Sequence, residues 1–136
     1  MRDYCPVCGT VFKHGIVTGK PCPMPDCIGD EIVTIDENLV LVIKALNELG
    51  YATAYCCGGH AFDNYPQTYI TFYGAIQFDK LPKGFEISTF THEEDTTTTI
   101  SKFYPRTLSP FDLQRKLWQT AKDLLTWVET LPQNVE

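Results

Sequence analysis

The sequence of 136 residues contains no run of eighteen or more apolar residues and few basic ones, with 11 lysines and arginines against 17 aspartates and glutamates. Without such an apolar run, a membrane-spanning helix is excluded. The formal net charge of −6 disfavours nucleic acid as a partner, because nonspecific binding to phosphates depends on many lysines and arginines. We therefore expect a soluble protein.

Large aliphatic side chains are sparse in residues 1–30, and the N-terminus does not show the pattern of a secretory signal peptide. A segment this short and this poor in apolar side chains cannot bury enough surface to fold alone. We expect a bound metal to supply its folding free energy, on the order of 10 kcal/mol for a structural zinc site. The expected location is the cytoplasm, where thiols stay reduced.

Two close cysteine pairs stand in that segment, Cys5-Pro-Val-Cys8 and Cys22-Pro-Met-Pro-Asp-Cys27. Their C-x2-C and C-x4-C spacings are typical of thiolates that hold a structural zinc ion from two short loops. Disulfides explain the pattern less well, because an orderly disulfide framework would not place two further cysteines side by side, as Cys56 and Cys57 are. The sequence predicts a zinc ribbon over residues 1–30, with zinc held by Cys5, Cys8, Cys22 and Cys27.

Hydrophobic periodicity predicts an α+β domain over residues 31–136. Apolar residues at three- and four-residue steps before Gly50 indicate a helix over 37–49, with a capping box formed by Thr34 and Glu37. Ser109 and Pro110 are typical of the start of a final helix. Strands are expected at 11–13 and 16–18, as a ribbon hairpin, and at 32–35, 51–56, 68–73, 85–90 and 97–103. The predicted fold is a mostly antiparallel sheet covered by two helices, with a small N-terminal zinc ribbon.

The final helix should present one apolar stripe to the core. We expect Trp118 in the core and Trp127 at its edge, because nine residues separate the two and they do not share one helix face. The predicted stripe consists of Phe111, Leu117, Trp118, Ala121, Leu124, Leu125 and Val128.

A second group of reactive residues, Cys56-Cys57-Gly58-Gly59-His60, follows the strand at 51–56. His60 could activate Cys56 or Cys57 as a nucleophile, which makes these three the candidate catalytic residues. Cys57 and His60 could instead hold a second metal together with His92 or His14. A third interpretation is an anion or ligand pocket formed by Gly58, Gly59 and His60. The fourth is structural: a small core cysteine, glycines with positive φ and a hydrogen-bonded histidine.

Residues 46–60, followed by Tyr69-Ile70-Thr71-Phe72, resemble a family of small bacterial and phage proteins of uncharacterised function. The shared pattern is LNxxGYxTxxxCxGH followed by YIxF, often behind an N-terminal cysteine pair. The Thr-x-x-x-Cys-x-Gly turn is also distantly similar to the wybutosine-synthesis tRNA methyltransferase family, in which a comparable turn borders the active site. That similarity would imply a tRNA substrate and a methyl donor, and His60 takes the place of the arginine usual in that family.

The sequence favours a zinc-binding accessory or regulatory protein, with a site for a small anionic ligand or a protein partner at the Cys56–His60 turn. One alternative is a Cys/His-dependent transferase or hydrolase that acts on a nucleotide or RNA. Another is a purely structural protein-interaction module.

Overall fold

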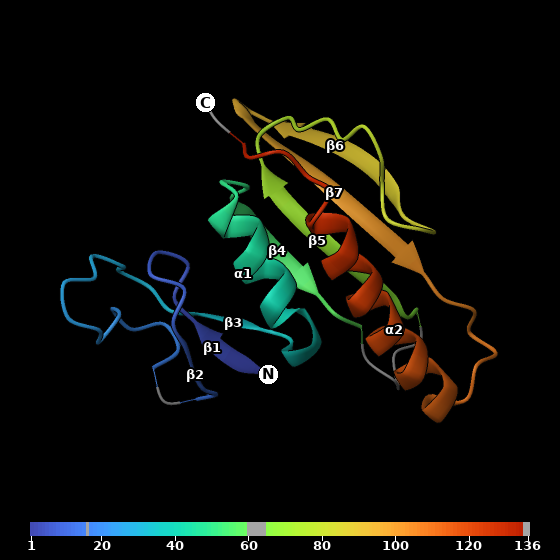
Figure 1. Cartoon of the computed structure of the whole chain (residues 1–136), viewed down its shortest axis with the longest axis horizontal. Helices are drawn as coiled ribbons and strands as arrows, with labels where there is room; N and C mark the ends of the chain where they lie inside the picture. Colours follow the sequence, from blue (N-terminus) through green and yellow to red (C-terminus); the bar gives the residue numbers. More distant parts are fainter. Residues whose placement is uncertain (16, 60–64, 135–136) are drawn as a thin grey trace.

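The computed structural model describes residues 1–15, 17–59 and 65–134. Two helices lie on one face of a four-stranded antiparallel sheet, and a smaller three-stranded antiparallel sheet lies beside them (Figure 1). The predicted α+β class is confirmed. Neither helix of the described residues combines the length and the hydrophobicity that a membrane-spanning segment needs.

The N-terminal sheet contains strands β1 (Arg2–Tyr4), β2 (Val11–Lys13) and β3 (Val33–Ile35) in the order β2-β1-β3. The predicted hairpin between 11–13 and 16–18 is wrong: β2 pairs with β1, and the described residues Val17 and Thr18 form a bend and a turn. Gly15 has a φ of 86°, which turns the chain away from an extended path directly after β2.

The larger sheet contains β4 (Thr53–Cys57), β5 (Gln67–Tyr73), β6 (Glu86–His92) and β7 (Asp95–Phe103) in the order β4-β5-β7-β6. Ile70 of β5 lies opposite Ile100 of β7, and both side chains are buried on the face that the helices cover. The predicted hairpin at residues 85–103 is confirmed, with Glu93 in the left-handed region at its turn.

The first helical segment consists of a 3-10 turn, η1 (Glu37–Leu39), and the helix α1 (Val40–Glu48). It begins after Asp36 with no side-chain cap, so the predicted capping box is wrong. The two residues of that box bond elsewhere: Thr34 donates to Asp3, and Glu37 accepts from Arg2. Both partners lie on β1, because β3 pairs with β1 before the chain enters the helix.

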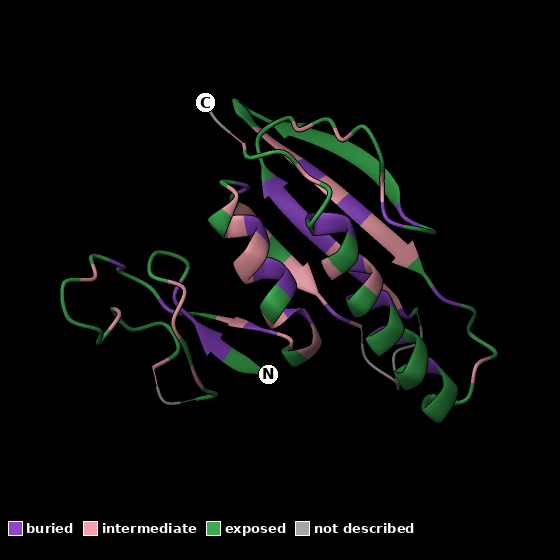
Figure 2. Ribbon diagram, viewed as in Figure 1, coloured by how far each residue is buried: buried purple, intermediate pink, exposed green. Residues whose placement is uncertain are grey.

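Helix α2 (Pro110–Val128) begins as predicted, since the Ser109 hydroxyl accepts from the amide of Asp112 at 3.1 Å. The assignment of the two tryptophans is wrong. Trp127 is 6% exposed and donates from Nε1 to the carbonyl of Lys80, whereas Trp118 is 45% exposed. Phe111 is exposed as well. Four residues of the predicted stripe are buried as expected, Leu117, Ala121, Leu124 and Val128, and Leu113 is buried with them. Buried and exposed residues alternate along this helix (Figure 2).

The main core extends into the N-terminal sheet. Tyr4 of β1 and Ile35 of β3 belong to the same buried cluster as Leu46 of α1 and Phe72 of β5. Strand β3 also pairs with β1 although it lies beyond residue 30. The division into a ribbon over 1–30 and a domain over 31–136 stays a prediction.

Candidate metal centre and adjoining cleft

The four N-terminal cysteines converge on one point. Their Sγ atoms all lie within 4.8 Å of one another, and the Cys5–Cys27 and Cys8–Cys22 pairs are each 3.7 Å apart. Tetrahedral zinc with Zn–S bonds of about 2.3 Å requires sulfur atoms about 3.8 Å apart. The arrangement therefore fits a four-thiolate metal ion, as the cysteine spacing predicted.

The backbone around each cysteine pair turns tightly to place the sulfur atoms. The carbonyl of Cys5 accepts from the amide of Gly9 at 2.8 Å, and Gly9 has a φ of 77°. In the second pair, Cys22 donates its amide to the carbonyl of Gly29 at 2.9 Å. A Cβ atom on Gly29 would lie 2.9 Å from the sulfur of Cys5, so a glycine is needed where the two loops meet.

Hydrogen-bond donors point at two of the sulfur atoms. The amide of Gly29 donates to Cys27 Sγ at 3.4 Å, and the Thr10 hydroxyl lies 3.2 Å from Cys8 Sγ. The bonds from Thr10 lower the pKa of the Cys8 thiol to about 6, whereas burial raises the pKa of Cys22 to about 12. Donors to sulfur favour the thiolate, which is the form that binds metal.

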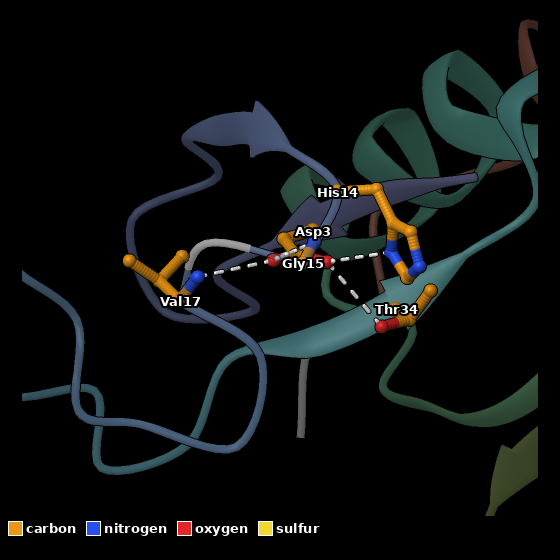
Figure 3. Close-up of polar contacts among 5 residues, drawn as sticks. All are labelled: Asp3, His14, Gly15, Val17 and Thr34. Carbon is orange, nitrogen blue, oxygen red and sulfur yellow. Dashed lines mark hydrogen bonds and ion pairs between the residues drawn. The ribbon is translucent and has the colours of Figure 1, made fainter.

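Asp3 fixes the loop between the two cysteine pairs. Its fully buried carboxylate accepts from the amides of Gly15 and Val17 and from the Thr34 hydroxyl, and it lies 3.2 Å from Nδ1 of His14 (Figure 3). Burial raises the pKa of this carboxyl. Its hydrogen bonds lower the pKa, the one from the Thr18 side chain most of all, and together they outweigh burial and leave the pKa below its usual value. The loop is therefore tied to β1 two residues before Cys5.

A cleft of about 650 Å³ adjoins the metal centre and lies between β3 and β4. Pro6 of the first cysteine loop lines its ribbon side, and Ile43 and Asn47 of α1 line the helix side. Among the described residues, no charged side chain lines this cleft. Its volume is in the range of about 300–1,000 Å³ that ligand-binding sites occupy.

Asn47 connects the two sides of the cleft. Its Nδ2 donates to the Tyr4 hydroxyl at 3.0 Å, and its Oδ1 accepts from the Thr53 hydroxyl at 3.4 Å. The residue was not among the predicted site residues. A polar residue one helical turn after the buried Ile43 was the signal in the sequence that would have indicated it.

The glycines of the predicted 56–60 site have partners within the chain. The amide of Gly58 donates to Asp36 Oδ2 at 2.7 Å, and the amide of Gly59 donates to Cys57 Sγ at 3.4 Å. An anion at these amides would have to compete with the Asp36 carboxylate. Gly59 has a φ of 90°, which agrees with the structural interpretation of this turn.

The two adjacent cysteines point in different directions, because Cys56 lies opposite Ile70 and Cys57 lies opposite Tyr69. Cys56 packs against the core, and burial, with Asp36 and Cys57 nearby, raises its pKa to about 12. A thiol with such a pKa stays protonated near neutral pH and is a poor nucleophile. His60, the third candidate catalytic residue, lies outside the described residues.

The second metal site has no support among the described residues, where the four N-terminal cysteines are the one group of possible metal ligands. His92 ends β6, which β5 and β7 separate from β4. Three strand spacings, about 14 Å in all, therefore lie between His92 and Cys57, too far for a shared metal ion. His14 lies beside Asp3 in the N-terminal sheet.

The fold and the cysteine cluster define this chain as an α+β protein with four clustered cysteines that could hold a metal ion. No protein-family model, curated protein or solved structure matches it. The resemblances drawn from residues 46–60 and 69–72 stay predictions.

Proposed function

We propose that this chain is a zinc-binding accessory or regulatory protein in which Zn²⁺ is structural, and whose α+β domain binds a protein partner beside the Cys56–Gly59 turn. The observation that carries the proposal is the convergence of four Sγ atoms within 4.8 Å. A site closed by four protein ligands leaves no position for water or substrate, which is typical of structural zinc.

The metal centre is connected to the rest of the protein through β1. Cys5 is buried and follows Tyr4 directly, and the Tyr4 ring packs in the core that α1 and β5 share. When bound, zinc supplies folding free energy to a segment with few apolar side chains. Because Pro6 also lines the cleft, the folded ribbon forms part of the surface that a partner would meet.

A protein partner suits this surface better than a small anion. The Gly58 amide is already bonded to a carboxylate of the same chain, and no charged side chain of the described residues lines the cleft. No disulfide joins any of the six cysteines, which suits a reducing compartment such as the cytoplasm.

The test is metal analysis of the purified protein and of two cysteine variants. We expect one equivalent of zinc in the wild type and in the Cys56→Ser/Cys57→Ser double variant, and less than a tenth of that in Cys8→Ser. Absence of zinc from the wild type, or loss of zinc from the double variant, would overturn the proposal. The double variant is the matched control, because it removes thiols outside the cluster.

A further inference from the structure

We infer that the cleft between β3 and β4 binds an extended, uncharged peptide segment that adds as a strand to the outer edge of β4. This inference rests on the proposed accessory function and names the chemistry of the partner. The segment would lie against β4 on one side and face β3 on the other.

The two strands turn their edges, not their faces, toward the cleft. Successive side chains of a strand point to opposite faces of its sheet, so a sheet face would contribute alternate residues to a cleft wall. Here every residue from Ala52 to Cys56 lines the cleft, and so does every residue from Val33 to Ile35. Consecutive lining of this kind means that backbone borders the cleft on both sides.

The two strands that border the cleft, β3 and β4, are each the outermost strand of their sheet. In the part of the chain that the structure describes, β4 is an outermost strand in the order β4-β5-β7-β6, and β3 is an outermost strand in the order β2-β1-β3. An outermost strand presents a row of backbone amides and carbonyls, which is the template that an extended peptide uses in strand addition. The cleft therefore offers the outer backbone edge of β4 together with the side chains that also line it, among them Tyr69 and Tyr73 of β5.

Strand β4 carries no charged side chain or proline that would block such pairing, and its one protective feature is the bulge between Thr53 and Tyr55. Edge strands are commonly blocked by lysine, by other charged side chains or by proline, and residues 53–57 contain none of these. At the opposite edge of the same sheet, β6 begins at Glu86 and is followed by Glu93 and Glu94. The register shift between Thr53 and Tyr55 confines regular pairing to Tyr55–Cys57, and the small side chain of Ala54 leaves the edge accessible.

Charge and shape decide which segment fits. A charged side chain placed in a cleft with no charged lining residue would lose hydration without gaining a partner, so the segment should be uncharged. Five residues matching β4 would span about 17 Å. The Asn47 amide already fixes Tyr4 and Thr53 in place, so little ordering of the walls would accompany binding.

The experiment selects ligands from a displayed library of seven-residue peptides without Asp, Glu, Lys or Arg. The bait is the zinc-loaded full chain, and the variants are Ala54→Arg on the cleft wall and Ala75→Arg at an exposed position outside the lining. We expect enriched peptides to bind the wild type and Ala75→Arg equally, and to bind Ala54→Arg at least tenfold more weakly. Bound peptide should slow hydrogen exchange in β4 at the outward-facing amide, or amides, of Tyr55–Cys56 that do not pair with β5, a readout that does not depend on how Ala54→Arg folds.

Several outcomes would overturn the inference. These are no enriched peptide, equal binding to Ala54→Arg, or protection of amides outside β4. A chain dimer that Ala54→Arg dissociates, or a small molecule seen on the purified protein by native mass spectrometry and lost in Ala54→Arg, would assign the cleft to another occupant. Zinc content measured on the same samples separates the two proposals: one equivalent of zinc without peptide binding refutes the peptide alone, and a lack of zinc refutes the zinc proposal.

Discussion

Asn47 donates a hydrogen bond from Nδ2 to the hydroxyl of Tyr4 at 3.0 Å, and thereby joins helix α1 to the first strand of the N-terminal sheet. Tyr4 is 1% exposed and Cys5, which follows it, is buried. The candidate metal centre is therefore joined directly to the main core, because its ligand Cys5 follows the core residue Tyr4 in the chain.

Replacing Asn47 by alanine should lower the free energy of unfolding by about 2 kcal/mol, because it leaves the buried Tyr4 hydroxyl without its donor. Urea denaturation of the zinc-loaded protein measures the change. The matched control is Asn134→Ala, which removes an exposed bond to the carbonyl of Gly50 and should cost less than about 1 kcal/mol. Equal effects of the two substitutions would contradict the role given to Asn47.

Gly59→Ala should destabilise the protein more than Gly74→Ala. Both glycines have a φ near 90°, but a Cβ on Gly59 would lie 2.5 Å from Leu117 Cδ2, whereas nothing lies within 4 Å of one on Gly74. The left-handed backbone costs about 1–2 kcal/mol in either variant, and overpacking adds roughly 1–3 kcal/mol at Gly59 alone. Urea midpoints test the difference, and similar midpoints would show that the turn does not pack on α2.

Cys56 should react slowly with iodoacetamide in the folded protein. Its pKa of about 12 lowers the thiolate fraction near neutral pH by about a thousandfold relative to an ordinary thiol. Mass spectrometry of the alkylated peptide, with the urea-unfolded chain as reference, measures the rate. Fast alkylation in the folded state would restore Cys56 as a candidate nucleophile.

The raised pKa of Cys56 also predicts how the free energy of unfolding depends on pH. The folded-state pKa of Cys56 is raised above its unfolded value, so the folded state keeps a proton that the unfolded chain releases. The protonated Cys56 thiol therefore contributes its full share to the free energy of unfolding below about pH 9, and this contribution is lost as the pH rises toward about 12. The difference in urea midpoint between wild type and Cys56→Ala should therefore change between pH 8 and pH 11. A difference that stays constant over this range would show that Cys56 is not buried as a thiol.

Removal of the metal should unfold the N-terminal sheet first. Chelation is expected to abolish hydrogen-exchange protection in β1 and β2 while β5 and β7 keep theirs, because Ile70 and Ile100 lie opposite each other on paired strands and pack in a core that includes α1 and α2. Uniform loss of protection would mean that the zinc centre and the sheet fold as one unit.

Local patterns predicted most of the elements and the β6–β7 pairing, but not the partner of β2. The α2 start at Ser109 and the β6–β7 hairpin depend on neighbouring residues, so cap and turn chemistry identified them. Strand β2 pairs with β1, and the Asp3 carboxylate of β1 also accepts from the amides of Gly15 and Val17, which follow β2. That contact spans more than ten residues, and no periodicity in the sequence reports it.

The sequence predicted one part of the candidate site, the cysteine cluster, and missed the other, the cleft. Ligand spacing within about five residues identified all four clustered cysteines, because metal geometry restricts that spacing. The cleft was missed, since it forms where β3 and β4, separated by helix α1, come to face each other. The sequence predicted Trp118 to be in the core and Trp127 at its edge, and the structure shows the reverse. Periodicity within α2 could not reveal that Trp127 donates a hydrogen bond to the carbonyl of the distant Lys80.

X-ray absorption at the zinc edge of the purified full chain tests the central claim most directly. Four sulfur ligands at about 2.3 Å are predicted, with no nitrogen or oxygen in the first shell, and the spectrum should be unchanged in the Cys56→Ser/Cys57→Ser variant. A shell with fewer than four sulfur atoms, a nitrogen ligand, or a protein that binds no zinc would contradict the account.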